Sequence, residues 1–123
     1  MTQKLALLAW SISADAPDLC AAPFVYATAA AALDAEVEIH FAGPAVKLLV
    51  VGVAEQAMTS GGKPVYAFMR EAANLGVKFL ACTMAAGLHL STGNEMIPEV
   101  AGETGASAYA ARALDPEWRT LVF

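Results

Sequence analysis

The 123-residue sequence is poor in charge, and this scarcity excludes several classes of protein. Charged residues make up 15% of the chain and hydrophobic residues 58%, whereas charged residues usually make up roughly 25% of a globular domain. Natively disordered chains have the opposite balance, so we expect an ordered protein with one domain over residues 1–123. So little charge cannot cover a monomer's surface well, which favours a homo-oligomer.

Basic residues are the scarcest charged group, with seven Lys and Arg and a net charge of −5. They are scattered singly, which argues against nucleic acid and against an anionic membrane surface as partners. The longest uncharged stretch, residues 19–33, is shorter than the roughly 20 residues that cross a bilayer. The N-terminus lacks the apolar region and cleavage site of a signal peptide, so we expect a cytoplasmic protein.

Motifs for common cofactors are also missing. Cys20 and Cys82 are too few for a disulfide framework, and we treat both as free thiols. Residues 61–63 (Gly-Gly-Lys) lack the first glycine and the Ser or Thr of a phosphate loop, and no dinucleotide fingerprint or nucleophile elbow occurs. His40 and His89 belong to no cluster with cysteines. No metal or organic cofactor is expected.

The sequence instead contains a regular alternation of strand and helix patterns. Strands are predicted at residues 4–10, 36–41, 77–81, 98–101 and 120–123. Helices are predicted between Asp18 and Asp34, with Asp18 as the N-cap, and at residues 64–75, 83–90 and 104–114. Residues 46–58 fit a helix or a strand, and a short helix is favoured. Such alternation predicts an α/β fold with a mostly parallel sheet and helices on both faces.

Cys82 is the candidate reactive residue because it lies where the third strand meets a helix. Ligands gather at the carboxyl ends of parallel strands, and the amides of a helix N-terminus favour a thiolate. The alternative is an inert core cysteine, because Cys82 lies between the apolar Ala81 and the segment that contains Met84. Spacing alone does not decide between these interpretations.

Other residues are assigned either to the crevice at the carboxyl ends of the strands, where Cys82 lies, or to the core. Trp10, Ser11, Thr83, Met84 and His89 are candidates for substrate binding at the strand exits, and His89 is also a candidate for proton transfer. Trp10 and Met84 fit the core equally well, and His89 fits a helix cap.

Cys20 also allows two interpretations. It follows the exit of the first strand, so it would lie near Cys82 if it faced the crevice. It also falls on one helical stripe with Phe24, Ala27 and Ala31, which favours a core position.

Several segments together resemble one known family. They are the first strand at residues 4–10, Ile39-His40-Phe41-Ala42-Gly43, Gly76-Val77-Lys78-Phe79-Leu80-Ala81-Cys82, and Ile97-Pro98-Glu99-Val100-Ala101-Gly102. In their order and spacing the chain resembles the DsrE/DsrF-like family of small sulfur-relay proteins, which also includes TusD-type subunits.

This resemblance implies a three-layer α/β/α sandwich around a five-stranded parallel sheet, assembled as a homo-oligomer or hetero-oligomer. It also implies that Cys82 accepts sulfane sulfur as a persulfide, from a donor protein and for an acceptor protein. The chain would then be a sulfurtransferase or a sulfur carrier. Cys82 is followed by Thr83 and Met84, and neither is a basic residue that would further activate the thiol. Two alternatives stay open, a non-catalytic ligand-binding or accessory subunit with a structural Cys82, and a thiol-based redox protein.

Overall fold

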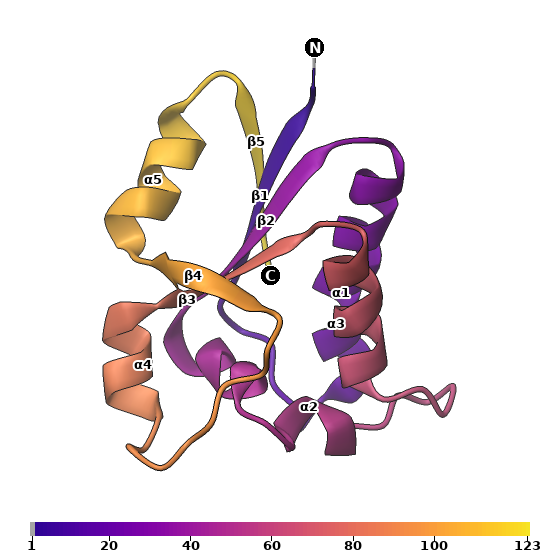
Figure 1. The fold of residues 1–123 in the computed structure, drawn as a ribbon. Helices are drawn as coiled ribbons and strands as arrows, with labels where there is room; N and C mark the ends of the chain where they lie inside the picture. The colour runs from indigo at the N-terminus through magenta and orange to yellow at the C-terminus, as the bar shows by residue number, and fades with distance from the viewer. Residues whose placement is uncertain (1) are drawn as a thin grey trace.

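The computed structural model describes residues 2–123, which form three layers (Figure 1). The strands are β1 (Lys4–Ala9), β2 (Glu36–Phe41), β3 (Lys78–Cys82), β4 (Val100–Thr104) and β5 (Trp118–Val122). The helices are α1 (Pro17–Ala32), the 3-10 helix η1 (Gly43–Leu49), α2 (Val53–Gln56), α3 (Val65–Asn74), α4 (Thr83–His89) and α5 (Ala106–Leu114). All strands are parallel, in the order β4-β3-β2-β1-β5. The predicted three-layer sandwich is confirmed.

One face of the sheet packs under α1 and α3 and forms the main core. Side chains alternate along a strand, so Ile39 and Phe41 of β2 share this face, and both are fully buried. The rings of Phe24, Phe41 and Phe79 meet at centroid distances of 5.4 to 6.0 Å. This aromatic cluster fixes the register of α1 on the sheet and holds the strand ends in place.

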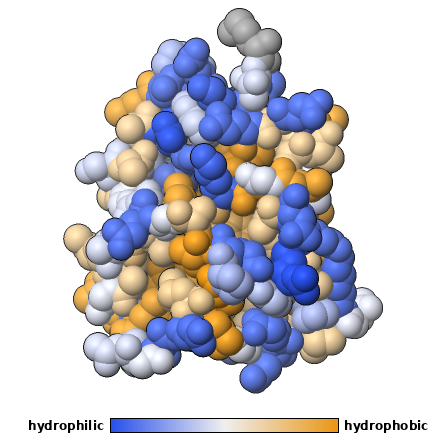
Figure 2. Space-filling model, in the orientation of Figure 1, coloured by the Kyte–Doolittle hydropathy of each residue, from blue (hydrophilic) through white to orange (hydrophobic). Residues whose placement is uncertain are grey.

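The other face is covered by α4 and α5 and is less tightly packed (Figure 1). None of the residues of α5, all within the described part of the chain, is buried. Figure 2, in the orientation of Figure 1, looks past the edge strand β4, and apolar residues, in orange, show among polar ones through the centre and lower part of that surface. The loose packing of α5 on this face leaves room for a cavity.

Several boundaries differ from those expected. The first helix begins at Pro17, so Asp18 lies in its first turn, where it accepts hydrogen bonds from Ser60 rather than capping the helix. Residues 46–58 contain the end of η1, a turn and α2, because Gly52 adopts a positive φ of 94°. β4 ends at Thr104 and α5 begins after it, so the strand predicted at 98–101 was placed too early. No helix within residues 2–123 combines the length and apolarity needed to cross a membrane.

Candidate functional site

The carboxyl ends of the strands meet at one edge of the sheet, where a cavity of about 640 Å³ opens. Its wall is mostly apolar and combines strand ends with residues from α4 and α5. The lining residues are Leu8, Trp10, His40, Ala42, Gly43, Pro44, Cys82, Thr83, Met84, Ala85, Leu88, His89, Thr104, Gly105, Ala106, Tyr109 and Ala110. Ligands of parallel sheets gather at this edge, so the cavity is the candidate site.

Cys82 contributes the thiol of the cavity wall. It is the last residue of β3 and the N-cap of α4, and it is half-buried. Cys20 differs, because it lies fully buried in α1, on the opposite side of the sheet. Burial raises the pKa of Cys20 to about 12, so its thiol stays protonated at neutral pH. Cys20 therefore occupies the core position that its helical stripe predicted.

Four of the five predicted substrate-binding residues line the cavity, and the fifth does not. Trp10, Thr83, Met84 and His89 share its wall with Cys82. Ser11 is not among the lining residues; its amide donates to the carbonyl oxygen of Phe123 at 3.0 Å. Whether the four residues bind a substrate remains a prediction.

Gly43 is required by the shape of the cavity wall. Its φ is 53°, and a Cβ atom there would lie 3.3 Å from the indole ring of Trp10. We expect Gly43→Ala to lower the free energy of unfolding by about 1 to 2 kcal/mol, because an L side chain is strained at this φ. Urea unfolding measures the change. Gly61→Ala is the control, because its Cβ would meet nothing within 4 Å, and an equal loss there would contradict the explanation.

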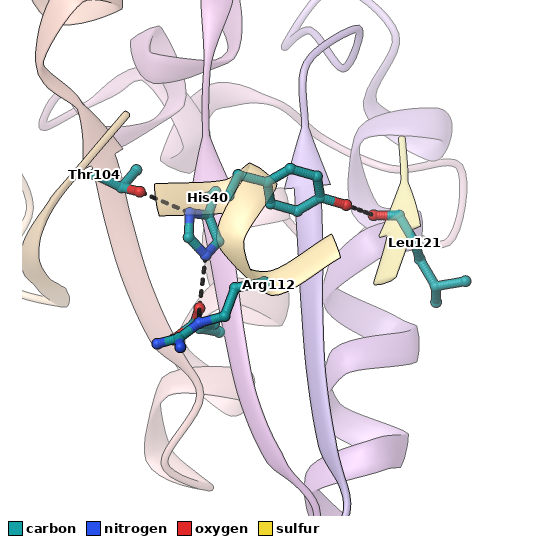
Figure 3. A network of polar contacts seen from close by, with 6 residues as sticks. His40, Thr104, Arg112 and Leu121 are labelled. Atoms are coloured by element: carbon teal, nitrogen blue, oxygen red, sulfur yellow. Dashed lines mark hydrogen bonds and ion pairs between the residues drawn. The ribbon is translucent and has the colours of Figure 1, made fainter. Parts of the chain in front are cut away.

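A chain of polar side chains runs from the cavity wall across the sheet (Figure 3). His40 Nδ1 lies 2.7 Å from Thr104 Oγ1, and His40 Nε2 lies 2.7 Å from Glu38 Oε1. Arg112 of α5 donates to the same Glu38 oxygen at 2.7 Å and stacks on the ring of Trp118 at 4.1 Å. The rings of His40 and Tyr109 pack in a T-shaped arrangement, with centroids 5.2 Å apart. The order Thr104, His40, Glu38, Arg112 thus links the cavity to α5.

The charges within this chain stabilise the ionised carboxylate. Burial alone would raise the pKa of Glu38, but hydrogen bonds and positive charge from Arg112 and His40 outweigh it and hold the pKa below its usual value. Glu38 is therefore a hydrogen-bond acceptor at neutral pH, and Nε2–H of His40 donates to it. The bond between His40 Nδ1 and Thr104 Oγ1 has either direction: Nδ1 accepts when the ring is neutral and donates when it is an imidazolium.

Sequence reasoning missed His40, Thr104 and their partners as site residues. One signal was available: Glu38 and His40 are two residues apart in a strand, so their side chains share a face, and both are buried. Thr104 could not be found, because it was predicted to begin a helix rather than to end a strand.

The site combines a thiol, a histidine with a carboxylate partner and an apolar wall. Within residues 2–123, no group of three or more His, Cys, Asp or Glu residues is arranged to hold a metal ion. Nucleophilic chemistry at sulfur, with a proton acceptor nearby, is the reaction type that these groups support.

Comparison with known proteins adds the family. No curated protein matches the chain. The DsrE/DsrF-like family matches residues 8–123, which include all five strand ends and the cavity wall between them. The chain therefore belongs to the DsrE/DsrF-like family.

Proposed function

We propose that this protein is a sulfur carrier, or a sulfurtransferase, that holds sulfane sulfur as a persulfide on Cys82. The family is generally linked to sulfur relay. The observation that carries the proposal is the position of Cys82, a half-buried thiol in the wall of an apolar cavity at the carboxyl edge of the sheet.

The reaction needs only thiol and persulfide groups. The Cys82 thiolate attacks the terminal sulfur of a donor persulfide, R–S–SH. A bond forms between the Cys82 sulfur and that terminal sulfur, and the S–S bond of the donor breaks. The donor leaves as a thiolate, which takes up the proton that Cys82 released. An acceptor thiolate then attacks the terminal sulfur of Cys82–S–SH and regenerates the Cys82 thiolate.

The cavity suits a bound persulfide for a physical reason. A terminal sulfur is soft and polarizable, so an apolar wall gives it favourable van der Waals contact. Trp10 and Met84 supply such surface at 54% and 76% exposure, so the cavity is both apolar and open. An open rim lets a donor reach the sulfur.

Partners belong to the same proposal. Donor and acceptor proteins would approach over the exposed apolar rim around Cys82, where Met84 and Leu88 are 76% and 75% exposed. Exposed apolar residues on α4 and the loose packing under α5 also support assembly into a homo-oligomer, in the cytoplasm, where thiols stay reduced. The net charge of −5 supports protein partners rather than nucleic acid.

Loading with polysulfide tests the proposal. Reduced protein is incubated with polysulfide, freed of excess reagent, and treated with cyanide, which converts sulfane sulfur to thiocyanate. We expect about one sulfane sulfur per chain, transferable to an added thiol, because Cys82 is accessible and Cys20 is not. Absence of labile sulfur after loading would contradict the proposal.

The size of the cavity favours a second candidate, the binding of a small apolar ligand with Cys82 as a structural residue. A cavity of about 640 Å³ with few polar groups falls within the range of small-molecule sites. In that case a Cys82→Ser variant would bind the ligand as the unchanged protein does. Sulfane sulfur on Cys82 separates the two candidates.

A further inference from the structure

The polar chain of Thr104, His40, Glu38 and Arg112 does more than hold α5 against the sheet. Within residues 2–123, Glu38 and His40 are the only buried polar or charged side chains, at 6% and 2% exposure. Removing such groups from water costs free energy, which their mutual contacts must offset. The ion pair between Glu38 and Arg112 already joins α5 to β2, so attachment of the helix does not require His40. The burial of His40 in this polar chain therefore needs another explanation.

The charge on Glu38 sets the direction of one hydrogen bond of His40. An ionised carboxylate only accepts, so Nε2–H of His40 donates to it, and in the neutral form of the ring Nδ1 is then an acceptor. Thr104 Oγ1, at 2.7 Å from Nδ1, is then the donor of that bond. The lone pairs of the Thr104 oxygen are left for a further hydrogen, on the side of the cavity that Thr104 lines. The array can therefore pass a proton from the cavity to the imidazole.

Cys82 lies in the position from which such a proton would come. In the parallel pairing of β3 with β4, Cys82 and Thr104 are register partners, so their side chains project from the same face. Neighbouring strands lie roughly 4.8 Å apart, which brings the two side chains next to each other. Both residues also line the cavity.

We propose that Thr104 and His40 form a proton relay that deprotonates the thiol of Cys82 as its sulfur attacks. The Cys82 S–H proton passes to the Thr104 oxygen while the Thr104 hydroxyl proton passes to His40 Nδ1. Thr104 is unchanged overall, and His40 becomes an imidazolium that Glu38 stabilises. The proton returns by the same path to the departing donor thiolate. The inference rests on the sulfur-carrier function proposed above, but deprotonation of the Cys82 thiol can be measured without any sulfane sulfur.

Each member of the relay has a distinct part. Thr104 is the group next to the reacting sulfur, whereas His40, Glu38 and Arg112 act through it and are positioning residues. The groups in contact with the His40 ring are Glu38 on its own strand, Thr104 of β4 and Tyr109 of α5; Arg112 bonds to Glu38, and Cys82 and His89 line the same cavity. Burial raises the pKa of Tyr109, so this phenol stays neutral while the relay operates.

Thr104→Val and Thr104→Ser, each combined with Cys20→Ala, test the relay. Valine keeps the shape of threonine but has no hydroxyl, and serine restores the hydroxyl without the methyl group. The readout is the rate of Cys82 alkylation by iodoacetamide between about pH 5 and 10, a range that covers histidine and thiol ionisation. Urea unfolding of each variant verifies that the fold is kept.

We expect Thr104→Val to slow alkylation about tenfold at neutral pH, and Thr104→Ser to restore the rate to within about threefold. The difference in alkylation rate between the proteins should disappear at about pH 10, where solvent base removes the thiol proton in every variant. Equal rates for all three proteins at neutral pH, or a deficit in the valine variant that persists at alkaline pH, would overturn the relay. If alkylation gives one of these results but polysulfide still loads sulfane sulfur on Cys82, the relay is wrong and the sulfur-carrier function stands.

Discussion

Replacing Cys82 with serine removes the labile sulfur that polysulfide deposits on the protein, and we expect the initial rate of uptake to fall at least about a hundredfold. A serine hydroxyl has the size of the thiol but forms no persulfide and is a far weaker nucleophile at neutral pH. The fold should be unaffected, because Cys82 is half-buried and the substitution is nearly isosteric. Thiocyanate release after cyanide treatment measures the effect.

Cys20→Ala is the matched control for this prediction. Cys20 is fully buried in the core under α1, and its raised pKa keeps the thiol protonated. We expect this variant to load sulfur as the unchanged protein does, with a small loss of stability from the cavity that the substitution leaves. Loss of labile sulfur in Cys20→Ala, with loading retained in Cys82→Ser, would show that the wrong cysteine has been assigned.

The second large effect concerns the stability of the site. We expect Glu38→Gln to lower the free energy of unfolding by about 2 to 3 kcal/mol, because it leaves a buried histidine and an arginine without a charged partner. Arg112 is partly exposed, which keeps the loss below that of a fully buried pair. Urea unfolding at pH 7 measures the difference.

The pH dependence of this loss follows from the lowered pKa of Glu38. A carboxyl group whose pKa is lower in the folded state stabilises the protein above its unfolded pKa of about 4.3 and loses that contribution as the pH falls through the folded pKa. The difference between the two proteins should therefore be full at neutral pH and should shrink as the pH falls below about 4.

Glu36→Gln, at an exposed position of the same strand, is the control and should change stability by less than about 0.5 kcal/mol. A Glu38→Gln loss that is independent of pH would contradict the role of the charge.

Much of the fold could be predicted from the sequence because strand and helix patterns alternate clearly. The strand at residues 36–41 was predicted with its observed bounds, since Val37, Ile39 and Phe41 alternate with polar residues. β4 was placed early because it is an edge strand with few apolar residues, and its end at Thr104 depends on pairing with β3. Pairing of distant segments leaves no local signal in the sequence.

The candidate site could be predicted in part because the strand and helix pattern around Cys82 is clear. Cys82 and its neighbours follow one strand directly, so their placement at the edge of the sheet needed only the fold class. Ser11 was predicted at the site but is not among the residues that line the cavity, and its role stays a prediction. The pairing of His40 with Thr104 joins residues 64 positions apart and requires the strand order.

The most direct test of the account is the location of sulfane sulfur along the chain. Protein loaded with polysulfide is blocked with an alkylating reagent, digested without reductant, and its two cysteine peptides are weighed. We predict an added mass of one sulfur atom on the peptide that contains Cys82 and none on the peptide that contains Cys20. An unmodified Cys82 peptide from natively folded, fully reduced protein would contradict the account.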